Sequence, residues 1–182
     1  MKLRLLQFGL AALALCFFSS CDNDDNESVA DSVNYIKVAE EEYELESGTL
    51  LYVEETSTQK YLYDISITSE GILVDKADAS GLYHKGNGSV VWFTMESESK
   101  EGILAGTYEI GDAFVSHAAY CMDWLDEKYD TDENMWVSIN TGRISVDISG
   151  DVYEITLIGA DAEGNDAKCY YKGKLQFYSL EN

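Results

Sequence analysis

Residues 144–157 read ISVDISGDVYEITL, with apolar and polar side chains alternating on both sides of a Gly-Asp pair. A period of two residues is typical of a strand with one buried face, and Gly150-Asp151 suits a tight turn. The apolar residues that share the inward face are Ile144, Val146, Ile148, Tyr153, Ile155 and Leu157. The stretch therefore predicts an antiparallel hairpin packed on one side.

The same alternation continues on both sides of this hairpin. Residues 161–166, DAEGND, predict a turn, and Cys169, Tyr171, Leu175 and Phe177 then alternate with polar residues. Further strands are expected in four segments, of which the first two form a hairpin: residues 50–53, 61–67, 89–95 and 104–110. Evidence for a helix is thin. We predict an all-β fold, an antiparallel β-sandwich, with a β-barrel as the alternative.

The N-terminal segment predicts export. Lys2 and Arg4 precede an apolar run, residues 5–18, of signal-peptide length. The residues Phe18-Ser19-Ser20-Cys21 resemble a bacterial lipobox, which implies lipidation of Cys21 with palmitate or a similar chain.

An acidic stretch, residues 22–27, follows Cys21 and is predicted to be disordered. It is similar to the export tag of surface-exposed lipoproteins of the Bacteroidota, which implies an outer-membrane lipoprotein facing the cell exterior. Retention on the periplasmic face is the alternative. The expected organisation is a lipoprotein signal peptide over 1–20, a lipidated Cys with an acidic tether over 21–34, and one β-sandwich domain over 35–182.

Four short motifs occur in a fixed order: LAGTY at 104–108, ISVDISGDVYEI at 144–155, DAEGN at 161–165 and YKGKL at 171–175. In this order they resemble a recurring domain of Bacteroidota lipoproteins, over roughly residues 43–178. The motifs mark turns and strands. The resemblance therefore implies a β-sandwich of undefined function and transfers no catalytic residue.

The chain has a formal net charge of −22, so it repels phosphate backbones and nucleic acid is excluded as a partner. Once Cys16 leaves with the signal peptide and Cys21 is lipidated, Cys121 and Cys169 are the candidates for a disulfide. The alternative is that both are small buried hydrophobic residues.

The sequence contains candidate residues for two kinds of metal site. Asp126, Asp130 and Asp132 are candidate calcium ligands in an acidic stretch, although the Gly and final Glu of an EF-hand loop are missing. His84 and His117 lack the spacing of a metal site and would have to converge in space. No cofactor other than calcium is expected.

The chain contains three Trp and 13 Tyr, and aromatic faces can stack on sugars. The candidate contact set near the acidic stretch is Tyr120, Trp124, Tyr129 and Trp136. The alternative is that such residues line the core.

No nucleophile elbow, zinc-protease helix or phosphate-binding loop is present, so the chain is not expected to be an enzyme. The sequence favours a lipid-anchored carbohydrate-binding or nutrient-binding module, operating beside an outer-membrane transporter. The alternative is a structural or adhesive surface protein that contacts other proteins.

Overall fold

The computed structural model describes residues 33–75, 82–125 and 136–180, all within one compact unit, Asp31–Asn182. These residues form twelve strands: β1 (Tyr35–Val38), β2 (Glu41–Glu44), β3 (Ser47–Glu55), β4 (Tyr61–Thr68), β5 (Ile72–Asp75), β6 (Tyr83–Ser97), β7 (Gly106–Glu109), β8 (Val115–Leu125), β9 (Val137–Ser149), β10 (Val152–Asp161), β11 (Asp166–Gly173) and β12 (Leu175–Ser179). Within the described part of the chain, no helix is long and apolar enough to cross a membrane. The prediction of an all-β fold is confirmed.

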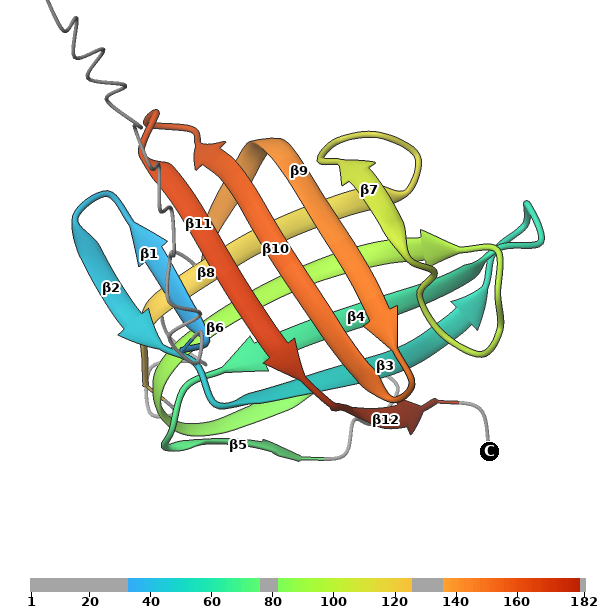
Figure 1. The fold of residues 1–182 in the computed structure, drawn as a ribbon, viewed down its shortest axis with the longest axis horizontal. Coiled ribbons are helices and arrows are strands. Elements are labelled where there is room, and N and C mark those ends of the chain that lie inside the picture. The colour runs from blue at the N-terminus through green and yellow to red at the C-terminus, as the bar shows by residue number, and fades with distance from the viewer. Residues whose placement is uncertain (1–32, 76–81, 126–135, 181–182) are drawn as a thin grey trace, which may run out of the picture. The chain divides into compact units, whose positions relative to one another are not determined.

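The strands belong to one curled sheet rather than two separate ones. Hydrogen bonds connect them in the order β12-β3-β4-β6-β8-β9-β10-β11-β1-β2, with β5 paired to β6 and β7 paired to β9. Figure 1 shows β9, β10 and β11 crossing in front of β3, β4, β6 and β8. The result is a half-barrel, so the predicted sandwich of two sheets is not confirmed.

The last strand makes the sheet mixed. β12 runs parallel to β3, whereas the other pairs are antiparallel, so the expectation of a purely antiparallel sheet is wrong here. Only Lys174 separates β11 from β12, and the Tyr171 hydroxyl donates a hydrogen bond to the Lys174 carbonyl at 2.8 Å. The chain therefore passes directly from β11 to the edge of β3.

The core lies between the two layers of the curled sheet. Ile144, Ile155 and Leu157 are each no more than 1 % exposed, which confirms the inward face predicted for the 144–157 hairpin. Ile148, near the turn, is 37 % exposed. The rear layer contributes the largest fully buried side chains of this core: Tyr52, Tyr63 and Phe93.

The β10–β11 turn is fixed by a buried carboxylate. Asp161 accepts hydrogen bonds from the backbone N–H groups of Glu163 and Asn165 and from the Asn165 side chain, each at 2.9 Å. The hydroxyl of Tyr120, which reaches across the core from β8, donates a fourth at 3.0 Å. These hydrogen bonds, that of the Asn165 side chain foremost, lower the pKa of Asp161.

We expect Asp161→Ala to lower the free energy of unfolding by about 2–3 kcal/mol, because the four hydrogen-bond donors lose the buried carboxylate that they share. Urea denaturation measures the change. Asp151→Ala is the matched control, since Asp151 also lies at a hairpin turn but its side chain is 71 % exposed and pairs only with Lys174. Equal losses for the two variants would contradict this account of the turn.

Candidate functional site

All three tryptophans and both histidines of the chain lie outside the main core, on the outer face of β4, β6 and β8. We call Trp92, Trp124, Trp136, His84 and His117 the aromatic patch. Alternation along β6 explains its position, because Val91, Phe93 and Met95 face the main core and Trp92 must point the opposite way.

The rings of the aromatic patch are in continuous contact. Trp136 lies 5.7 Å from Trp92 and 5.6 Å from Trp124, measured between ring centroids. His117 packs on Trp92 at 4.9 Å, and His84 packs on Trp124 at 5.5 Å. Trp124 is only 1 % exposed, whereas Trp92 and Trp136 are half-buried.

A short hairpin covers part of this face. β5 pairs with the first residues of β6, and Ile72 of β5 packs with Val90, Cys121 and Trp124 in a second, smaller hydrophobic cluster. His84, on the same hairpin, lies 2.6 Å from Ser66 of β4, measured from Nε2 to Oγ. Ser66 is completely buried, so an outward-facing polar residue of β4 is enclosed beneath the hairpin.

Polar side chains fix the orientation of Trp92. Asp64 on β4 accepts a hydrogen bond from the Thr94 hydroxyl at 2.6 Å and another from the Trp92 side chain. Burial raises the pKa of Asp64, while these hydrogen bonds and the nearby His117 act in the opposite direction. Asp64 therefore positions the half-buried indole of Trp92.

Burial lowers the pKa of His84 to about 4, from an ordinary value of 6.5. Between these two values the unfolded chain binds a proton that the folded chain does not, so stability falls as the pH falls through this window. We expect His84 to reduce the free energy of unfolding by about 2 kcal/mol between pH 7 and pH 5.

The measurement is the difference in free energy of unfolding between wild type and His84→Gln at each pH. Gln keeps a hydrogen-bonding group near Ser66 and does not titrate. The pH dependence that the acidic residues contribute is common to both proteins and cancels in the difference. Parallel stability curves for the two proteins would contradict the assigned burial of His84.

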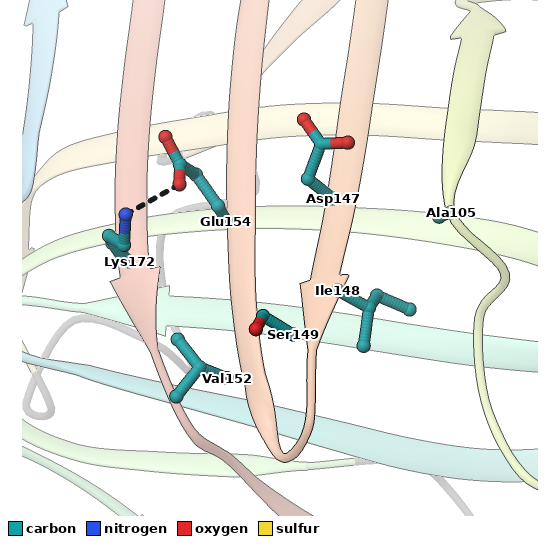
Figure 2. Close-up of a pocket in the computed structure, with 7 residues that line it drawn as sticks. All are labelled: Ala105, Asp147, Ile148, Ser149, Val152, Glu154 and Lys172. Carbon is teal, nitrogen blue, oxygen red and sulfur yellow. Dashed lines mark ion pairs between the residues drawn. The ribbon is translucent and has the colours of Figure 1, made fainter.

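A different hollow lies on the outer face of β9, β10 and β11, with a volume of about 180 Å³. Figure 2 shows Lys172 and Glu154 joined by an ion pair of 2.7 Å, with Asp147 on the neighbouring strand and Ile148 between β9 and Ala105. The side chains of the pair are 51 % and 37 % exposed. This hollow has no aromatic lining, and its lysine is already paired with a carboxylate, so we do not favour it as a ligand site.

The predicted contact set is divided by the sheet. Trp124 and Trp136 belong to the aromatic patch, whereas Tyr120 faces the main core and is 5 % exposed, because its hydroxyl reaches Asp161. Tyr129 lies outside the described residues. The structure therefore does not bring Tyr120 and Trp124 to one accessible surface.

The two cysteines are free and buried on opposite faces of the sheet. Cys121 packs with Val90 and Trp124 on the outer face, and Cys169 lies in the main core. The suggested disulfide is therefore not formed, and the alternative of two small hydrophobic residues describes both. Burial raises the pKa of both thiols, that of Cys169 to about 12.

Other predicted residues fall beyond what the structure describes, namely Cys21, Asp126, Asp130 and Asp132. Within 33–75, 82–125 and 136–180, no three His, Cys, Asp or Glu side chains are grouped to hold a metal ion. The two histidines do lie on one patch, but they connect through Trp92 and Trp136 rather than through a shared ligand position.

Sequence reasoning missed Trp92, His84 and His117 as members of one surface. The indication was present in residues 89–95, where Val90 and Trp92 are apolar on the face opposite Val91 and Phe93. A strand that is apolar on both faces is expected to be covered on both.

Comparisons with known proteins return no relationship. No protein-family model matches the chain, and neither a curated protein nor a solved structure matches it.

Proposed function

We propose that the chain is a non-catalytic, lipid-anchored binding module of a bacterial outer surface, and that it binds neutral polysaccharide through Trp92 and Trp136. The anchor in this proposal is Cys21, as the lipobox resemblance implies. The observation that carries the binding proposal is the aromatic patch, in which the half-buried indoles of Trp92 and Trp136 lie in contact.

Charge and ring geometry narrow the ligand class. A net charge of −22 disfavours anionic polymers, so uncharged chains are the preferred partners. The indoles of Trp92 and Trp124 both pack on Trp136, with centroids 5.6–5.7 Å apart and ring planes tilted by 55–58°. The half-buried indoles of Trp92 and Trp136 suit the apolar face of a sugar ring, which stacks from one side.

The adhesive alternative depends on an open sheet edge, and β2 argues against it. β2 ends the strand order, and three of its four residues, Glu41, Glu42 and Glu44, are exposed carboxylates. Charged residues along an edge strand oppose pairing with another chain. This protection applies to β2, whereas β12, at the other end of the strand order, has no charged residue and exposes Phe177. The binding module is therefore preferred on the aromatic patch and not on the sheet edges.

The test is isothermal titration of the purified full chain with a panel of neutral polysaccharides, alongside anionic polysaccharides as the matched control. We expect saturable binding to at least one neutral polymer and none to the anionic polymers. The absence of binding to every neutral polysaccharide would overturn the proposal and favour the structural or adhesive function.

Calcium remains a prediction that rests on Asp126, Asp130 and Asp132. If these carboxylates bind calcium, adding EDTA should lower the melting temperature, and excess calcium should restore it. A melting temperature that is the same with EDTA and with calcium would contradict the prediction of a calcium site. Binding through Trp92 and Trp136 should survive EDTA in either case.

A further inference from the structure

A second, polar hollow adjoins the aromatic patch where β8 and β9 separate. The two strands pair at only two positions among the described residues, Ala119 with Ser138 and Tyr120 with Val137. Beyond them, β9 pairs with β7 instead. The hollow that opens there has a volume of about 190 Å³ and is lined by Ile110, Gly111, Ser116, His117, Ala118, Ser138, Ile139 and Asn140.

His117 belongs to both features. Its ring packs on Trp92 at 4.9 Å and also lines the hollow, so the hollow is a direct continuation of the aromatic patch. Alternation along β8 turns His117 away from the main core, because Ala118 and Tyr120 face it. A β-bulge follows directly, because β6 pairs Thr94 with His117 and Met95 with Val115, which leaves Ser116 as the extra residue. Bulges re-aim side chains and are frequent beside functional sites.

The lining is rich in hydrogen-bonding groups. Ser116, Ser138 and Asn140 are exposed, and together with the His117 ring they present donors and acceptors without a formal charge on the first three. These side chains lie where the pairing of β8 with β9 ends, at Ala119 with Ser138 and Tyr120 with Val137. Such a lining matches a hydroxyl-rich, uncharged ligand.

The size of the hollow limits what enters it. A volume of about 190 Å³ lies below the ~300–1,000 Å³ of pockets that enclose a whole drug-sized ligand. It therefore suits one unit of a longer chain rather than an isolated ligand held on all sides.

We infer that the polysaccharide site has two subsites, which rests on the proposed function. One sugar ring stacks on Trp92 or Trp136, and a neighbouring unit of the same chain places its hydroxyl groups in the hollow between β8 and β9. His117 lies between the two subsites and contacts both units.

The test compares four single variants of the full chain, including Trp92→Ala, each titrated with a neutral polysaccharide that binds the wild type. Ser138→Leu fills the hollow from an exposed strand position, and we expect it to weaken binding about tenfold with an unchanged melting temperature. Asn140→Ala removes a hydrogen-bonding side chain, and we expect about fivefold weaker binding. Ser149→Leu is the matched control on β9, because it alters the hollow of Figure 2 instead.

The outcomes separate the two proposals. Wild-type affinity in both Ser138→Leu and Asn140→Ala, with binding lost in Trp92→Ala, would overturn the second subsite and leave the proposed function standing. Wild-type affinity in Trp92→Ala as well would overturn both. If Ser138→Leu lowers the melting temperature, the variant disturbs the fold as well as the hollow. The affinity of Asn140→Ala then decides whether the second subsite stands.

Discussion

Replacing Gly142 by Ala should lower the free energy of unfolding by about 4 kcal/mol and the melting temperature by on the order of 10 °C. Gly142 lies in the middle of β9, between the residues that pair with β8 and those that pair with β7. Figure 1 shows β9 curving over from the rear layer to the front layer of the sheet. The substitution therefore acts on the strand that joins the two layers.

Two effects combine at this position. The φ angle of Gly142 is +130°, which side chains rarely adopt, and strain of that kind costs about 1–3 kcal/mol. A Cβ at Gly142 would also lie within 3.0 Å of the Ile158 carbonyl oxygen and of the Gly159 Cα, both backbone atoms of the paired strand. Because backbone cannot move aside as a flexible side chain can, the β9–β10 pairing must give way.

Gly150→Ala is the matched control, since Gly150 lies at the turn of the same hairpin. Its φ angle is +63°, and a Cβ there would meet nothing within 4 Å. Only the strain of the positive φ angle remains, so we expect the free energy of unfolding to fall by about 1 kcal/mol. Urea denaturation measures both variants. A loss at Gly142 no larger than that at Gly150 would contradict the bend that we assign to β9.

Trp92→Ala should weaken ligand binding and Trp124→Ala should lower stability, although both remove an indole of the aromatic patch. Trp92 is half-buried and is a ligand contact in the proposed function, so its loss should weaken polysaccharide binding by about 2 kcal/mol, or roughly thirtyfold. Trp124 is 1 % exposed and packs with Ile72, Val90 and Cys121, so its loss should lower the free energy of unfolding by about 3–5 kcal/mol.

Titration calorimetry gives the affinity, and urea denaturation gives the stability of each variant. Trp92→Phe is a further control, because it keeps a ring in place while removing the indole that hydrogen bonds to Asp64. We expect it to retain more affinity than Trp92→Ala. Binding lost in Trp124→Ala with an unchanged stability would show that the ligand reaches Trp124 instead, and would contradict the assignment of Trp92.

Local alternation predicted the strands well but not their assembly. The hairpin at 144–157 and the strands at 61–67 and 89–95 follow from the period of two, and the structure contains them. Whether the strands divide into two sheets or curl as one depends on the β8–β9 junction, which consists of two residue pairs. No pattern within either strand encodes that junction.

Long-range pairing explains the other differences. The parallel direction of β12 follows from its place beside β3, more than a hundred residues earlier in the chain. Cys121 and Cys169 are separated by the sheet itself, which the spacing of two cysteines cannot reveal. The aromatic patch likewise gathers residues from β6, β8 and the start of β9, so only the folded sheet brings Trp92, Trp124 and Trp136 together.

The most direct test is the ¹H–¹⁵N spectrum of the chain, whose three indole N–H signals report on Trp92, Trp124 and Trp136 separately. Each signal is assigned from the matching Trp→Phe variant, and the wild type is then titrated with a neutral polysaccharide that binds. We predict saturable shifts of the Trp92 and Trp136 signals and the smallest change at the buried Trp124. A polysaccharide that binds while all three indole signals stay unchanged would contradict the account.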